Sequence, residues 1–119
     1  MVLVRTNFRQ SDLAGADLSF ANLASANLDQ AVMTMANLNC AMLIAATLEG
    51  VDLREANLRH ASLFQAVLRG ATLAGARLTG ADLSNVDLTE VDLSGAIYDP
   101  RTRWPDGFDP TGCGAVLKG

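Results

Sequence analysis

The sequence predicts an all-β solenoid, in which short extended segments alternate with corners. Leucine, or another large apolar residue, occupies every fifth position from Leu3 to Tyr98. A small residue, usually Ala, stands two positions earlier, and a short polar residue, often Asp or Asn, stands between them. A period of five fits neither the helical period of 3.6 nor the strand period of 2, so one long helix or one flat strand is excluded.

Each five-residue unit divides into an extended half and a corner. In an extended segment the small residue and the leucine two positions later point to the same side, so both are expected inside. The last two residues of the unit turn the corner, where glycine is favoured for its freedom to adopt positive φ. Six glycines fall there: Gly15, Gly50, Gly70, Gly75, Gly80 and Gly95. Repetition of segment and corner winds the chain into a solenoid filled by leucine and alanine.

The tandem Ala-Asp/Asn-Leu-x-x pattern of residues 1–98 resembles that of the pentapeptide repeat proteins. The resemblance implies a right-handed quadrilateral β-helix with four pentapeptides per coil. Residues 1–98 would then form about five coils, roughly 24 Å tall at the ~4.8 Å spacing of neighbouring strands. Residues twenty apart would stack in columns on one of four faces.

Residues 99–119 differ in composition and are predicted to form a C-terminal cap and tail. All three prolines lie there, together with Trp104 and Phe108. With Tyr98, these rings are expected to cover the last leucine layer, because solenoids protect their open ends. The segment from Tyr98 to Pro110 also resembles the C-terminal segment of cyanobacterial pentapeptide repeat proteins, which implies a bacterial source of the cyanobacterial type.

The N-terminal end is predicted to lack a cap. The repeat register begins at Met1, with Leu3 and Phe8 already at inward positions. A second chain stacked on this end would cover it and give a homodimer. Attachment to another domain would cover it equally well.

The face centred on Leu3, Leu23, Leu43, Leu63 and Leu83 is the most apolar one, and we refer to it as the first face. Its predicted outward column runs Val4, Ala24, Ile44, Phe64, Ser84, with Met42 beside it. Contiguous exposed apolar groups usually mark an interaction site, so Val4, Met42, Ile44 and Phe64 form a candidate protein-interaction patch. The alternative is that they are scattered substitutions on a tolerant surface.

The net charge of the chain argues against a second function that the resemblance suggests. Some pentapeptide repeat proteins are DNA mimics that bind DNA gyrase, so a gyrase- or topoisomerase-binding mimic is the alternative function. A mimic ~24 Å long would need about fourteen negative charges at one per ~1.7 Å. The net charge is -4, from thirteen acidic and nine basic residues. The excess of acidic residues also argues against direct binding to nucleic acid.

No catalytic, cofactor or metal site is expected. Cys40 and His60 fall one coil apart on a corner of the fourth face, but a nucleophile there would need an orienting third group and a cleft. One His cannot form a multi-His metal site, and two Cys do not indicate a disulfide framework. No signal peptide or membrane-length apolar run is present. We therefore predict a cytoplasmic, non-enzymatic structural or protein-interaction module with an unknown protein partner and no contact with membranes.

Overall fold

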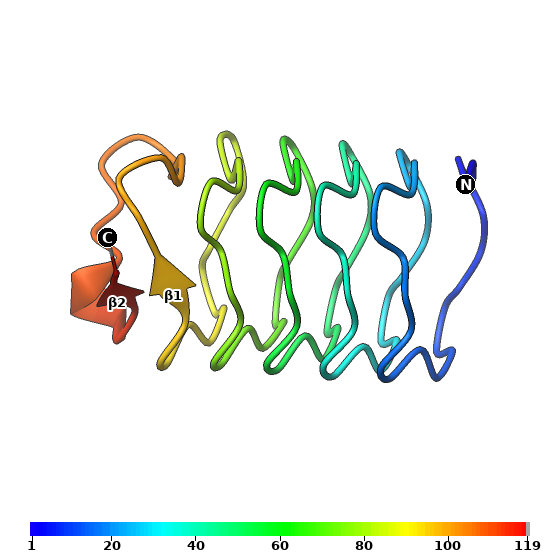
Figure 1. Cartoon of the computed structure of the whole chain (residues 1–119), viewed down its shortest axis with the longest axis horizontal. Coiled ribbons are helices and arrows are strands. Elements are labelled where there is room, and N and C mark those ends of the chain that lie inside the picture. The colour runs from blue at the N-terminus through cyan, green and yellow to red at the C-terminus, as the bar shows by residue number, and fades with distance from the viewer. Residues whose placement is uncertain (119) are drawn as a thin grey trace.

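The computed structural model describes residues 1–118 and shows a solenoid of stacked loops (Figure 1). Parallel β-bridges join residues twenty positions apart, from Val2 with Asn22 to Arg77 with Ile97. Because the sequence repeats every five residues, four repeats complete one coil. We number the coils by residues 1–20, 21–40, 41–60, 61–80 and 81–98. The molecule measures 33 × 24 × 22 Å.

The interior consists of the residues that the repeat predicts. Each large residue of the series from Leu18 to Leu83 is at most 6% exposed. The small residues from Ala21 to Ala81 are at most 3% exposed. Burial of one leucine side chain contributes about 1.5–3 kcal/mol, so the leucine ladder is the main source of stability.

Hydrogen bonds between coils follow the same period. The N–H of Leu23 donates to the carbonyl of Met42 at 2.7 Å, and the N–H of Asn22 donates to that of Met1 at 2.9 Å. Within a unit, the polar residue before the leucine accepts the N–H two positions later, as Asp12 does from Ala14 at 3.1 Å. The short Asp and Asn side chains therefore stabilise the turns.

Every corner residue from Arg5 to Gly95 has a positive φ, between 58° and 72°. Six of these corners are the predicted glycines, but thirteen carry other residues, among them Phe20 and Cys40. Glycine is therefore not required at the corner. The corner N–H of Cys40 donates to the carbonyl of Arg59 at 2.9 Å, and bonds of this kind hold the left-handed backbone in place.

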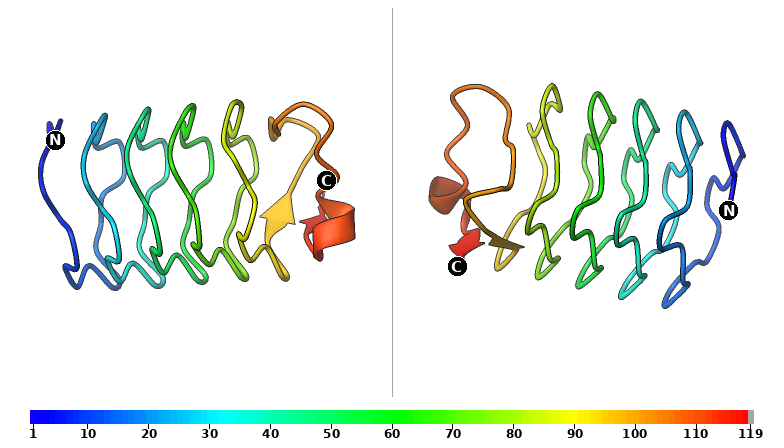
Figure 2. Two further views of the ribbon diagram at one scale, coloured as in Figure 1. Left: turned by 180° about the vertical axis from the view of Figure 1, so that it is seen from behind. Right: turned by 45° about the horizontal axis from the view of Figure 1, so that its top comes forward.

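The C-terminal residues continue the ladder with an altered spacing. They comprise β1 (Ile97–Tyr98), the 3-10 helix η1 (Thr111–Cys113) and β2 (Val116–Leu117), which pairs in parallel with β1 (Figure 2). Asp82 pairs with Arg103, twenty-one positions later, whereas Ile97 pairs with Val116, nineteen positions later. The cap is thus an irregular further turn of the solenoid.

Three aromatic rings pack together inside the cap. Tyr98 and Trp104 meet edge to face with ring centroids 5.5 Å apart, and Trp104 stacks on Phe108 at 5.3 Å. Such pairs stabilise by about 0.5–1.5 kcal/mol beyond their buried area. The structure therefore brings together the three rings that the sequence placed over the last leucine layer.

The ladder is interrupted on the second face, between residues 66–70 and 86–90. Within residues 1–118, the N–H groups of Leu68 and Gly70 have no hydrogen-bond acceptor, and Val67 forms no bridge to Asp87. Val86 occupies the inward small position at the start of this segment, and Val91 occupies the next one. A valine at this position does not by itself break the ladder, because Asp52 and Asp92, which follow Val51 and Val91, both pair with Thr72.

The first coil covers its leucine layer less completely than the coils above it. Leu3, Phe8 and Leu13 are partly exposed, whereas Leu23 and Leu28 of the second coil are fully buried. Among residues 1–118, no helix has the length and apolar character needed to cross a bilayer.

Candidate functional site

Backbone hydrogen bonds place the outward column of the first face on successive coils. The N–H of Arg5 donates to the Ala24 carbonyl, that of Ser25 to the Ile44 carbonyl and that of Ala45 to the Phe64 carbonyl, each at 3.0 Å. Val4, Ala24, Ile44 and Phe64 therefore follow one another along the solenoid axis, as the twenty-residue spacing predicts. We call Val4, Met42, Ile44 and Phe64 the first-face patch.

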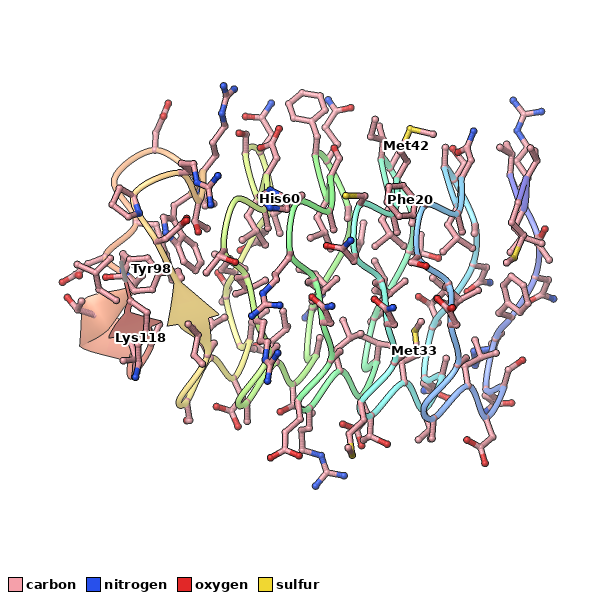
Figure 3. The ribbon with its side chains drawn as sticks, in the orientation of Figure 1. Phe20, Met33, Met42, His60, Tyr98 and Lys118 are labelled. Atoms are coloured by element: carbon pink, nitrogen blue, oxygen red, sulfur yellow. The ribbon has the colours of Figure 1, made fainter. Side chains whose placement is uncertain are left out.

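The members of the first-face patch present apolar side chains to solvent. Val4, Met42 and Ile44 are 40%, 42% and 39% exposed, and Phe64 is partly exposed. Met42 lies at the rim of the coils in Figure 3. The structure thus places the four predicted residues on one surface.

One exposed aromatic residue extends this region beyond the predicted patch. Phe20 is 67% exposed at the corner that leads directly into the first face at Ala21 and Asn22 (Figure 3). The sequence signal was available, since position 20 is the last of its coil and therefore borders the first face. A ring at this corner enlarges the apolar surface.

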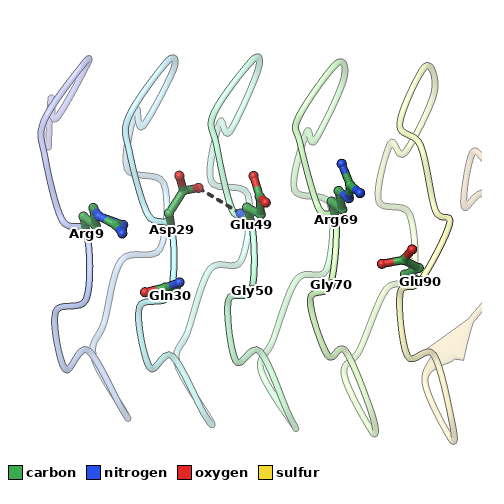
Figure 4. A pocket seen from close by; sticks show the side chains of 8 residues that line it. All are labelled: Arg9, Asp29, Gln30, Glu49, Gly50, Arg69, Gly70 and Glu90. Carbon is green, nitrogen blue, oxygen red and sulfur yellow. Dashed lines mark hydrogen bonds between the residues drawn. The ribbon is translucent and has the colours of Figure 1, made fainter.

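The second face carries a shallow hollow of about 380 Å³ that opens over Gly50 and Gly70 (Figure 4). Both acidic and basic side chains line it, including Asp29, Glu49 and Arg69. The Asp29 carboxylate accepts the backbone N–H of Glu49 at 2.9 Å. This face therefore mixes acidic and basic residues and does not present a continuous acidic stripe.

Several carboxylates of the other faces are engaged by neighbours within the same turn. Asp52 forms an ion pair with Arg54 at 2.7 Å, and the hydrogen bond from Arg54 lowers the pKa of the Asp52 carboxyl. Hydrogen bonds from Ser19 and Ser94 lower the pKa of Asp17 and Asp92 in the same way. These carboxylates stabilise the turns of the coil, because each accepts the backbone N–H two residues later.

Cys40 and His60 occupy successive corners of the fourth face. Cys40 is a free, partly buried thiol, and the His60 imidazole lies over Gly80, where an added Cβ would overlap it. In the part of the chain that the structure describes, no group of three His, Cys, Asp or Glu residues is arranged to hold a metal ion.

The Pentapeptide repeats family model matches the chain in eight copies, over residues 2–39, 36–66 and 61–97. These matches cover the repeat region that the sequence pattern delimits. No curated protein matches the chain.

Solved structures of repeat proteins are also similar to the chain. A pentapeptide repeat protein from Nostoc is 33% identical, over 96% of this chain and 86% of that one, with a TM-score of 0.49. Rfr23 from the cyanobacterium Cyanothece is 36% identical, over 82% and 63% of the two chains, with a TM-score of 0.48. QnrB1, a plasmid-mediated fluoroquinolone resistance protein, has a TM-score of 0.57 over 95% and 68%, but at 16% identity it shares the fold alone.

Proposed function

The chain belongs to the pentapeptide repeat family, and we propose that it is a non-enzymatic interaction module that presents a rigid β-helical surface to a protein partner. The frame that we infer is a right-handed quadrilateral β-helix of about five coils, closed by the C-terminal cap. The bridges between residues twenty apart support this frame. A rigid frame favours binding because little conformational entropy is lost when the partner docks.

The observation that carries the proposal is the first-face patch. Three of its apolar side chains, Met42, Ile44 and Phe64, come from the neighbouring third and fourth coils, and Val4 comes from the first coil of the same face. Within residues 1–98 the charges of this face, Arg5 and Asp82, cancel, and the cap adds Arg103 next to Asp82 at the C-terminal end. A neutral apolar centre bordered by polar residues has the composition of the core of a protein–protein interface.

A DNA mimic that acts on gyrase is the competing proposal, and the charge distribution opposes it. Arginines interrupt the acidic columns: Arg54 is paired with Asp52, and Arg69 shares the second-face hollow with Glu49 and Glu90. A gyrase supercoiling assay with excess protein separates the two proposals. Inhibition of supercoiling that weakens steeply with salt would favour the mimic.

Replacement of two patch residues tests the proposed function. The I44S/F64S variant removes apolar surface without touching the leucine ladder. We expect it to lose a partner that the wild type captures from lysate of the source cells, with its thermal unfolding still cooperative. The matched control is V32S/M35S, which removes two exposed apolar side chains from the region of the third face. Equal capture by wild type and I44S/F64S would refute the patch.

We also propose a second contact. The partly exposed leucine layer of the first coil forms the interface of a homodimer. Light scattering at dilute concentration measures the mass of the particle directly. A stable monomer would contradict the dimer and favour another domain as the cover.

A further inference from the structure

Three cationic side chains line one hollow on the fourth face. Arg59, Arg77 and Lys118 line a hollow of about 320 Å³ together with Thr79 and Ile97. This is at the small end of the volume range of ligand pockets, which is about 300–1,000 Å³. The chain as a whole is acidic, with a net charge of -4, so a local group of three cations runs against its composition.

The cap completes this group of cations. The bridge between Asn57 and Arg77 sets Arg77 one coil above Arg59, and Arg77 pairs in turn with Ile97. Ile97 pairs with Val116, and the N–H of Lys118 donates to the Tyr98 carbonyl at 2.8 Å. The altered register of the cap thus brings Lys118, the single lysine of the sequence, to the face that already carries two arginines.

Protein carboxylates do not neutralise these cations. The ion pairs within residues 1–118 are Arg54 with Asp52 and Arg101 with Asp99, and neither includes a member of the hollow. Asp99 lies in the same twenty-residue column as Arg59 and Thr79. Its carboxylate, however, accepts the N–H of Gly80 at 3.0 Å and pairs with Arg101 at 3.0 Å. The donors of the hollow are therefore available to an external anion.

We propose that this cationic pocket, formed by Arg59, Arg77, Thr79 and Lys118, binds the phosphoryl groups of a phosphorylated ligand. Guanidinium groups form paired hydrogen bonds to phosphate oxygens, the ammonium adds a point charge and the Thr79 hydroxyl adds a donor. A single phosphate monoester carries about −1.5 to −2 charges near pH 7, which leaves one cation uncompensated. A diphosphate matches three cations better than a monophosphate.

Two kinds of ligand supply such a phosphoryl group, a free diphosphate and a lipid headgroup, and an experiment can distinguish them. A free diphosphate enters the pocket from solution. A phosphorylated lipid headgroup would use the same cations, and Val116 and Leu117 beside Lys118 are 41% and 54% exposed, as a membrane contact requires. The shared chemistry is an anion of high charge with several acceptor oxygens.

Calorimetric titration of the full chain with pyrophosphate, at low salt because screening weakens exposed charges, tests the proposal. We expect one site per chain and tighter binding of pyrophosphate than of inorganic phosphate. Arg77 and Lys118 are both exposed, so each can be replaced without disturbing the core. R77Q and K118Q should each weaken binding at least tenfold, which is a loss of about 1.4 kcal/mol of binding free energy. The matched control R69Q makes the same change in net charge on the second face and should alter affinity less than about twofold.

Sedimentation with vesicles forms the second arm. Binding to phosphatidate–phosphatidylcholine vesicles that R77Q abolishes, with no binding of pyrophosphate, would assign the phosphoryl group to a lipid. Absence of binding to pyrophosphate and to these vesicles would overturn the proposal, as would equal losses in R77Q and R69Q. The I44S/F64S variant should bind pyrophosphate like the wild type, so this result is independent of the first-face patch.

Discussion

At the scale of single residues, the corner conformation is the most unusual feature of the chain. Thirteen residues other than glycine hold a positive φ, a conformation that costs roughly 1–2 kcal/mol for a residue with a Cβ. The leucine ladder and the bonds between coils offset this cost at every turn. The repeat therefore leaves the corner open to many residue types.

Substitution of Ala45 by Gly should raise the free energy of unfolding by up to about 1 kcal/mol. Glycine relieves the cost of the left-handed backbone but loses more entropy on folding, about 0.5–1 kcal/mol. Ala45 is exposed with φ 58°, so no packing is lost. The converse change, Gly70→Ala, should destabilise by about 1 kcal/mol although its Cβ has room, since the nearest atom is the Gly50 nitrogen at 4.0 Å. Urea unfolding measures both, and a destabilised A45G would contradict the account.

The Asp99 carboxylate should make the stability depend on pH in the acidic range. Its burial is the largest single influence and raises the pKa, but hydrogen bonds from Gly80, Arg101 and Thr102 together lower it from 3.8 to about 2. A lowered folded-state pKa stabilises the protein above pH 3.8, and this stabilisation is lost as the pH falls toward 2. Asp99→Asn should therefore be less stable than wild type at neutral pH, with a difference that narrows over this window. A difference that stays constant down to the acidic end would rule out this role of Asp99.

At the scale of elements, the sequence predicts the regular coils well. It does not predict the two irregular segments, which are the C-terminal cap and the interrupted segment 86–90 of the second face. The inward residues were predictable because each of them repeats the same five-residue environment. The register change of the cap was not, because Pro100 to Pro110 contain no period from which pairing follows. The sequence pattern therefore does not predict that Lys118 and Arg77 line the same hollow.

Hydrogen exchange should detect the interrupted ladder on the second face. The amides of Leu68 and Gly70 lack acceptors, whereas the equivalent amides of Leu48 and Gly50 donate at 2.7 and 2.9 Å. An amide without a hydrogen bond needs less local unfolding before it exchanges with solvent. The amides of Leu68 and Gly70 should therefore exchange faster than their counterparts one coil earlier. Equal protection of the two pairs would show that the ladder continues through the fifth coil.

At the scale of the whole molecule, the solenoid separates stability from surface chemistry. Stability comes from the buried leucine and alanine of each repeat, which are nearly invariant along the chain. We propose that function comes from the columns that these repeats carry outward, such as the first-face patch and the cationic pocket. The patch was predictable since its spacing is the coil period, whereas the pocket needed the pairing of β1 with β2.

The central claim is that residues twenty apart are neighbours on successive coils, and disulfide cross-linking tests it most directly. In a chain whose native cysteines are replaced by serine, I44C/F64C places thiols on adjacent strands, where Cα atoms lie about 4.8 Å apart, within the range of a disulfide. The control I44C/R59C is fifteen residues apart and falls on different faces. We predict rapid intramolecular oxidation of I44C/F64C and none of I44C/R59C. Oxidation of the fifteen-residue pair, with the twenty-residue pair remaining reduced, would contradict the four-repeat coil.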